Sequence, residues 1–490
     1  TCALPISSNK KRYMMNASLK WQAADWLNVV GRVNLDNSDY RNKNEKSAST
    51  LTTFCGVSGG FEDAMRQERS LYADFLANID KTFGDFHLTA NVGASIYHTS
   101  MDQLYIAGDL VIPNFFQINN INFSANYKPD PTGYEDEIQS IFASAELSWK
   151  NQLYLTVTGR NDWDSKLAFS KQKSFFYPSV GLSALLSEMV KLPEVISYAK
   201  IRGSYTVVAS SFDRFLTNPG YEYNSQTHNW ANPTVYPMDN MKPEKTKSWE
   251  IGLNLKFWGN RFNLDATYYR SNTLNQTFKV DIPSSSGYKQ AIVQAGNVQN
   301  QGLELALGFN DKWAGFGWSS NATFTLNRNK VKRLASGSVN PVTGEAIQMD
   351  EMNVGWLGKE NVAPRVILTE GGSMTDIYVY NQLTKDNNGN IKVDQNGNLG
   401  ITSSNTPVKV GNLDADFNLG WTNHFTYKGI DLGVVLSARV GGLAYSATQG
   451  ILDYYGVSGT SATARDNGGI PINNGKVNAQ KYYQTIGTGE

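Results

Sequence analysis

The sequence predicts an all-β fold, namely an antiparallel transmembrane β-barrel, from three observations. The predicted strands alternate apolar and polar residues with period two, so each strand has one apolar face. Short turns alternate with long loops along the chain, as in outer-membrane barrels. No run of about 18 apolar residues occurs, which excludes an ordinary transmembrane helix. A large soluble sandwich is the alternative, and the alternation of turns and loops favours the barrel.

The composition agrees with a barrel and argues against other classes. Mean hydropathy is −0.40 and charged residues make up 18%, beside 25 Tyr, 22 Phe and 11 Trp. A membrane barrel is polar on average because half of its strand residues face a polar interior. Lys plus Arg (44) balances Asp plus Glu (44), so we expect no nucleic-acid partner. Two cysteines, Cys2 and Cys55, are too few for a disulfide framework.

The start of the chain predicts a division into two parts. Residues 1–6 (TCALPI) back-translate to a common sequencing adapter, so we interpret them as a non-native leader. Residues 7–490 are interpreted as part of a barrel. The chain begins with neither a Met nor a signal peptide, and we therefore expect an internal fragment.

Hairpins follow one another through the first half of the chain. We expect strands at residues 13–21, 27–35, 71–79, 86–96, 141–149, 153–157 and 201–207. Tight turns are expected at Ala24-Asp25, Phe83-Gly84-Asp85 and Lys150-Asn151-Gln152. Long polar loops are expected at about residues 36–67 and 101–134.

The clearest hairpin lies in the middle of the chain. Residues 249–257 and 262–268 alternate strictly around a Trp258-Gly259-Asn260 turn. Further strands are expected at residues 316–326, 417–427 and 432–440, and for the whole chain we expect about fifteen strands. In the second strand of this hairpin, three polar residues are expected to face the lumen: Asn263, Asp265 and Thr267. Three apolar residues are expected to face lipid: Phe262, Leu264 and Ala266.

Tryptophans lie near many of the expected strand ends, as in the aromatic girdles of membrane barrels. They are Trp21, Trp26, Trp149, Trp163, Trp249, Trp258, Trp313 and Trp318. The alternative is that they are ordinary core aromatics.

Several motifs occur in a fixed order over most of the chain. They are residues 177–183 (YPSVGLS), 199–205 (AKIRGSY), 241–252 (MKPEKTKSWEIG), 296–298 (GNV) with 300–305 (NQGLEL), 410–412 (VGN), 427–432 (YKGIDL), and 452–456 (LDYYG) with 464–466 (ARD). Together they resemble the SusC/RagA family of TonB-dependent outer-membrane transporters. One departure is that residues 411–416 (GNLDAD) lack the proline that this family usually has after Gly-Asn.

The resemblance implies a barrel of about 22 strands, of which this chain would supply roughly two-thirds. We therefore expect the plug domain, the TonB-binding box and the closing C-terminal strands of such transporters to lie outside this sequence. The resemblance also implies import of oligosaccharides or peptides across the outer membrane of a Gram-negative bacterium. A SusD-like surface lipoprotein would be the partner, TonB would supply the energy, and neither a cofactor nor enzymatic activity is expected.

Three alternatives stay open. One is a passive porin or an adhesin barrel, and another is a siderophore-type TonB receptor. The third is a soluble carbohydrate-active enzyme, which would need paired carboxylates on facing strands. Glu146, Glu250 and Glu304 fall on polar strand faces, but each also fits a polar lumen.

Residues 210–242 are the strongest candidate for contact with a substrate or partner. Aromatic side chains alternate there with asparagines, and such faces stack on sugar rings or peptides. The candidate residues are Tyr221, Tyr223, Trp230 and Tyr236. Packing of this loop against neighbouring loops is the alternative.

Two other motifs have weaker chemical interpretations. Residues 386–390 (DNNGN) and 394–398 (DQNGN) form a tandem that we interpret as a pair of Asn-Gly turns. The alternative is a calcium site, with ligands from Asp386, Asn388, Asp394 and Asn396. Residues 56–60 (GVSGG) match the GxSxG pattern of hydrolases, but no βα alternation surrounds them, so we expect a loop.

Overall fold

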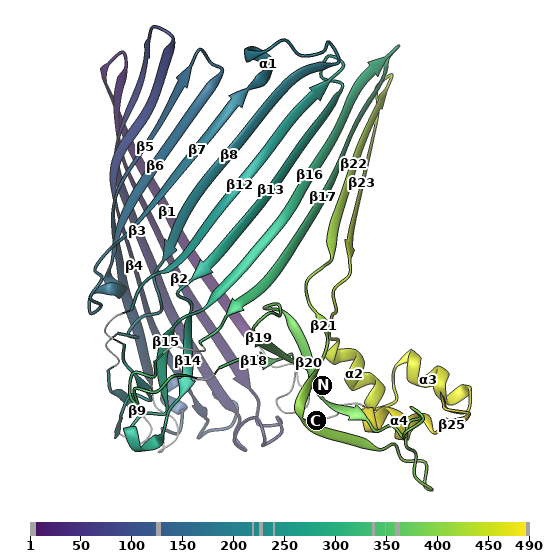
Figure 1. Cartoon of the computed structure of the whole chain (residues 1–490). Coiled ribbons are helices and arrows are strands. Elements are labelled where there is room, and N and C mark those ends of the chain that lie inside the picture. The colour runs from purple at the N-terminus through teal and green to yellow at the C-terminus, as the bar shows by residue number, and fades with distance from the viewer. Residues whose placement is uncertain are drawn as a thin grey trace. The chain divides into compact units, whose positions relative to one another are not determined.

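The computed structural model describes residues 6–123, 129–217, 220–224, 229–238, 241–335, 339–347, 349–357 and 363–486. Strands dominate these ranges, as the sequence predicts (Figure 1). None of the helices within them has the length and apolarity that crossing a membrane requires.

The largest sheet has 14 strands, hydrogen-bonded in the order in which they follow along the chain. They are β1 (Ile6–Ala24), β2 (Leu27–Lys46), β3 (Gly60–Phe83), β4 (Phe86–Asp109), β5 (Asp130–Trp149), β6 (Leu153–Asp164), β7 (Phe175–Leu185), β8 (Ile196–Ser210), β12 (Glu244–Phe257), β13 (Phe262–Leu274), β16 (Asn297–Trp313), β17 (Phe316–Arg333), β22 (Phe417–Tyr427) and β23 (Ile430–Val440).

Smaller elements lie in the connections between these strands and in the segment that follows β23. The strands are β9 (Glu222–Asn224) with β10 (Asn229–Ala231); β11 (Val235–Tyr236), β14 (Thr277–Asp281) and β15 (Gln290–Gln294); β18 (Glu351–Trp356), β19 (Arg365–Thr369), β20 (Asp376–Leu383) and β21 (Ile401–Asn412); and β24 (Ile470–Ile472) with β25 (Gly475–Val477). The helices are α1 (Leu186–Met189), α2 (Ala447–Tyr454), α3 (Gly459–Asp466), α4 (Ala479–Ile486) and the 3₁₀ turns η1 (Ile118–Asn120), η2 (Ser165–Leu167) and η3 (Ser284–Ser286).

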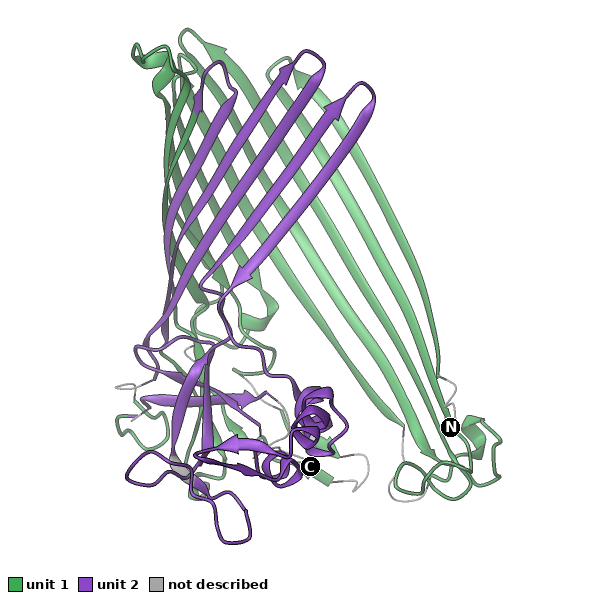
Figure 2. Cartoon of the chain, turned by 90° about the vertical axis from the view of Figure 1, so that its right-hand side faces the viewer, with its two compact units in different colours: residues 1–255, 273–295, 338–346 green, residues 256–272, 296–337, 347–490 purple. Residues whose placement is uncertain are grey.

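The chain divides into two compact units (Figure 2). Unit 1 comprises Thr1–Leu255, Thr273–Ala295 and Ser338–Ala346. Unit 2 comprises Lys256–Asn272, Gly296–Gly337 and Ile347–Glu490.

In unit 1, the antiparallel register aligns apolar side chains into continuous rows. Trp21 pairs with Val29, which pairs with Ala77, and Ala77 pairs with Val92. Directly opposite residues project from the same face, so this row is one line of an apolar belt across β1–β4. Many of its large side chains are exposed, such as Trp21 at 64%. A sheet face this apolar requires a partner, and a bilayer core provides one.

The strands of unit 1 are longer than predicted. β2 continues to Lys46 and β3 begins at Gly60, so the expected loop at residues 36–67 shrinks to residues 47–59. The expected loop at 101–134 shrinks likewise to residues 110–129, and the first turn lies at Asp25-Trp26, one residue later than expected. The alternation is lost in these extensions because charged residues stand on both faces, and the few apolar ones, such as Phe61 and Ile106, pack in a small core with Leu110 and Ile121.

Ion pairs hold the extended part of β2 against β3. Arg41 donates to Asp63 at 2.7 and 3.0 Å, and Lys46 donates to Glu62 at 2.6 Å. Ile6 already lies in β1, opposite Asn44, whereas residues 1–5 lie outside the described residues. The interpretation of residues 1–6 as a leader therefore stays a prediction.

Unit 2 contains three antiparallel strand pairs of the large sheet. Two-residue turns at 314–315 and 428–429 join β16 to β17 and β22 to β23, and β17 pairs with β22. Aromatic rings gather at this turn end. Phe309 lies 4.6 Å from Phe262 and 4.7 Å from Trp318, measured between ring centroids. Trp258 contacts Phe262 at 5.3 Å. The aromatic enrichment predicted for strand ends is therefore present at this end of the unit.

Buried cores lie at the ends of the long strands and in the segments outside them, not in the middle of these strands. In unit 1, Leu167, Phe212 and Met241 pack with Phe175 and Ile292. In unit 2, Leu399, Ile472 and Val477 form a second core that fixes the hairpin of β24 and β25. The long connections are thus folded structures that can position side chains.

Candidate functional site

The aromatic segment of unit 1 forms a small hairpin. Tyr223 on β9 pairs with Trp230 on β10, and their rings lie 5.1 Å apart at 54°. Both side chains are exposed, Trp230 at 68%. The pair therefore presents an aromatic surface, as expected for a contact with a sugar ring or a peptide.

Beside this hairpin lies a cavity of about 450 Å³ with an apolar lining. Its wall is formed by Phe215, Leu216, Tyr221, Pro233, Val235 and Ile292, with Arg214, Gly220 and Thr234. Phe215 is 69% exposed and has a φ of 62°, a left-handed conformation that is unfavourable for a large side chain. Such strain gathers at ligand-contacting sites, so Phe215 joins the predicted residues.

Arg214 is anchored by unit 1 itself. Its Nε donates to Asp136 Oδ2 at 2.7 Å, and its guanidinium stacks on the Tyr134 ring at 3.5 Å. The cation is neutralised, and the cavity is therefore suited to an apolar group.

The fourth predicted residue, Tyr236, has a different environment. It lies on β11, half-buried, and its ring meets the Tyr288 ring edge-on at 5.2 Å. The structure thus brings Tyr223 and Trp230 together, places Tyr221 on the cavity wall and packs Tyr236 against Tyr288.

The two Asp-Asn-Gly motifs of unit 2 adopt the same turn. Asp386 Oδ1 accepts the N–H groups of Asn388 (2.8 Å) and Asn390 (2.9 Å). Asp394 Oδ1 accepts those of Asn396 (2.8 Å) and Asn398 (2.7 Å). The predicted pair of turns is confirmed.

These hydrogen bonds bear on the calcium alternative. The backbone N–H of Asn390, with that of Asn388, lowers the pKa of Asp386, and Asn398 lowers the pKa of Asp394 in the same way. Both carboxylates accept backbone N–H donors on Oδ1, which accounts for the turns without a cation, and the calcium alternative stays a prediction. Elsewhere too, the described residues contain no group of three His, Cys, Asp or Glu side chains arranged for a metal.

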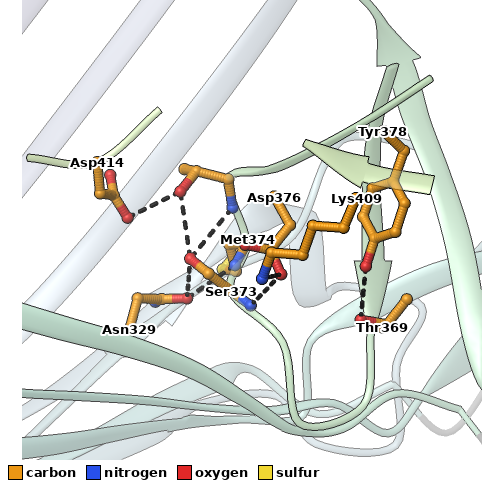
Figure 3. A network of polar contacts seen from close by, with 9 residues as sticks. Asn329, Thr369, Ser373, Met374, Asp376, Tyr378, Lys409 and Asp414 are labelled. Carbon is orange, nitrogen blue, oxygen red and sulfur yellow. Dashed lines mark hydrogen bonds and ion pairs between the residues drawn. The ribbon is translucent and has the colours of Figure 1, made fainter. Parts of the chain in front are cut away.

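A polar network that the sequence did not indicate fixes residues 369–376 in unit 2 (Figure 3). Asp376 is fully buried, and its Oδ2 accepts Lys409 Nζ at 2.6 Å and the Ser373 N–H at 3.0 Å. Asn329 of β17 accepts the N–H of Met374 at 2.8 Å. The loop between β19 and β20 is therefore tied to the end of β17, and no local sequence pattern could reveal this.

The face opposite the apolar belt is polar. In unit 1, Asp74 accepts both Nε and Nη2 of Arg32, at 2.9 and 2.7 Å, and the hydroxyl of Tyr72 at 2.9 Å. In unit 2, Tyr269 donates to Asn327 at 3.2 Å on the same face as Asp265 and Thr267. The GVSGG segment at residues 56–60 is followed by strand β3 and not by the helix that a hydrolase motif requires, in agreement with the expected loop.

Long antiparallel strands with an exposed apolar face and a hydrogen-bonded polar face define the wall of a membrane β-barrel. The chain belongs to the family of TonB dependent receptor-like β-barrels, whose model matches residues 5–358. Members of this family are outer-membrane transporters of Gram-negative bacteria, not enzymes. The predicted fold class is confirmed.

Similar proteins agree with this assignment. TonB-dependent receptor P3 of Formosa agariphila is 24% identical over 426 residues, which are 80% of this chain and 41% of that protein. TonB-dependent receptor SusC of Bacteroides thetaiotaomicron is 26% identical over 355 residues, which are 66% of this chain and 34% of that protein. The resemblance to the SusC/RagA family is confirmed.

Solved structures show the same fold. A structure of the RagAB peptide importer in the open-open state matches with a TM-score of 0.72 and 16% identity, covering 90% of this chain and 48% of that chain. This chain therefore spans less than half of the length of each of these three relatives.

Proposed function

We propose that this barrel wall serves the active import of oligosaccharides or peptides across the outer membrane. The observation that carries the proposal is the pairing of an apolar, exposed strand face with a polar one, in a chain of the TonB-dependent receptor family. The polar face would line the path of the cargo, with Asn263, Asp265 and Thr267 among its residues. TonB would supply the energy, as in the family.

A SusD-like surface lipoprotein is the proposed partner. Support comes from the sequence similarity to SusC, because the resemblance to that family implies such a partner. The partner would meet some of the long connections, since the short turns at the opposite strand ends offer little surface.

Within unit 1, we assign cargo or partner contact to the aromatic segment. Tyr221, Tyr223 and Trp230 present exposed rings beside an apolar cavity. Tyr236 would act by packing, because its ring is held against Tyr288. The calcium alternative at Asp386, Asn388, Asp394 and Asn396 has weaker support, since backbone N–H groups bond both carboxylates.

The test replaces Tyr221, Tyr223 and Trp230 with Ala in the full-length protein. We expect reduced uptake of the cognate nutrient or reduced copurification of the lipoprotein. A matched variant replaces three exposed aromatics of other unit 1 loops, Phe54, Phe115 and Phe169, and should leave both unchanged. Loss of uptake with an intact complex would assign the rings to cargo. Equal uptake and equal copurification in the two variants would refute the assignment.

Uptake measured in cells that carry the wild-type protein distinguishes active import from the alternatives. Collapsing the proton gradient should stop accumulation of the nutrient, whereas a passive porin would keep equilibrating it. Rescue of growth by iron chelates alone would point instead to a siderophore receptor.

A further inference from the structure

One row of side chains crosses the whole four-stranded sheet of unit 2. Trp356 on β18 pairs with Arg365 on β19, Arg365 pairs with Tyr378 on β20, and Tyr378 pairs with Lys409 on β21. Residues directly opposite each other in antiparallel strands project from the same face. One face of this sheet therefore carries two cations on either side of a tyrosine.

Aromatic rings clamp the first of these cations. The guanidinium carbon of Arg365 lies 3.4 Å from the centroid of the Trp356 ring and 4.6 Å from that of Tyr380. Arg365 Nη1 also donates to the Tyr380 hydroxyl at 3.5 Å. Stacking on two rings fixes the plane of the guanidinium, so little rotamer freedom remains to be lost when a ligand binds.

Arg365 has no counter-ion within the part of the chain that the structure describes. No carboxylate there lies within 4.0 Å of its nitrogens, whereas Arg32, Arg41 and Arg160 each bond an aspartate. Arg365 Nε is buried without a hydrogen-bond acceptor. A half-buried guanidinium with no anion among the described residues would be stabilised by a bound anion, which would meet its Nη groups because Nε is buried.

Lys409 adds a second cation to the same face. Its Nζ donates to the buried Asp376, and its side chain is still 47% exposed. Glu351 on β18, opposite Thr369, projects from this face as well, so the two cations of this face stand beside two carboxylates, and Arg365 is the cation that neither of them bonds. Lys409 is held in place by Asp376 in the way that Arg365 is held by its rings.

We propose that Arg365, assisted by Lys409, binds a carboxylate group of the cargo. A guanidinium is suited to this because its fixed N–H groups match the oxygens of a carboxylate. The proposal rests on the proposed import function, because it assumes that cargo meets the long connections. It goes further than that function in two respects: the cargo carries an anionic group, and the sheet of β18–β21 binds this group.

Calorimetric titration of the detergent-solubilised protein tests the proposal. The probes are hexagalacturonate, hexaglutamate and neutral maltohexaose, so that acidic sugar and acidic peptide are compared with an uncharged chain. We expect one acidic probe to bind and maltohexaose to bind at least about tenfold more weakly. R365Q should weaken that binding about tenfold or more and flatten its dependence on salt. R69Q, at an exposed arginine of β3 bonded to Asn37 and Gln67, should change neither.

Two further measurements keep the outcome decisive. Circular dichroism and thermal unfolding test whether R365Q is folded. If R365Q does not fold, R365K replaces it: this variant keeps the charge but loses the planar donors, and it should still weaken binding of the acidic probe. Equal binding of acidic and neutral probes, an unchanged affinity in R365K or R365Q, or binding of lipopolysaccharide micelles alone would overturn the proposal. The titration measures binding and not transport. If the protein binds the acidic probe but fails to import in cells, the binding site stands and only the import function is refuted.

Discussion

At the scale of single residues, Asp386 and Asp394 show how turn chemistry decides structure. Each carboxylate accepts the N–H groups two and four residues further on. Gly389 and Gly397 have φ values of 84° and 76°, which only glycine adopts without strain. The sequence predicts these turns because Asp, Asn and Gly stand in the required order. It could not show whether the carboxylates face N–H groups or a cation.

The lowered pKa values of Asp386 and Asp394 predict that both turns weaken in acid. A carboxyl whose folded pKa is depressed stabilises the fold above its unfolded pKa, and this stabilisation is lost as the pH falls through the folded value. Amide hydrogen exchange of residues 388–398 should therefore show protection above about pH 4 that declines below it. In D386N and D394N the same amides should show no such decline. An identical decline in wild type and variants would assign the effect to other groups.

Among the predicted contact residues, exposure could not be read from the sequence. Tyr221, Tyr223, Trp230 and Tyr236 look alike as aromatic residues of one polar segment. Only pairing distinguishes them, because Tyr236 belongs to β11 and meets Tyr288, 52 positions away in the chain. Arg365 was missed for the same reason: the two rings that clamp it, Trp356 and Tyr380, come from two other strands.

At the scale of elements, the strand cores could be predicted and the strand ends could not. Alternation marks the belt that faces lipid, where one face must be apolar. Beyond the belt charged residues stand on both faces, so the pattern resembles a loop, although Arg41–Asp63 and Lys46–Glu62 hold a regular ladder there. Loop lengths predicted from alternation are therefore upper limits in this kind of sheet.

The loop between β19 and β20 gives a prediction at the same scale. A Cβ at residue 372 would lie 2.5 Å from Thr369 Oγ1 and 2.7 Å from Asp376 Oδ2, so G372A forces the buried network to shift. We expect the free energy of unfolding to fall by about 1–3 kcal/mol. Denaturant titration in lipid vesicles and limited proteolysis of residues 334–416 measure the effect.

G355A, in β18 of the same sheet, is the matched control, because a Cβ there meets no atom within 4 Å. Its stability and cleavage pattern should equal those of the wild type. If G372A behaved like G355A, the network around Asp376 would not be what fixes this loop.

At the scale of the whole molecule, the family and the barrel architecture could be predicted because they depend on many weak signals that agree. Period-two alternation, short turns and ordered motifs recur along most of the chain. The cargo could not be predicted, since it depends on a few side chains from distant strands, such as the row from Trp356 to Lys409. Repeated features of a wall are visible in sequence, and unique features of a site are not.

The central claim is that the long strands cross a membrane with one face on lipid and the other on water. Single cysteines at residues 262–267 of β13, in a background without Cys2 and Cys55, test it most directly in native outer membranes. We expect a water-soluble thiol reagent to label positions 263, 265 and 267 and to spare 262, 264 and 266. Equal labelling of all six positions would contradict the account.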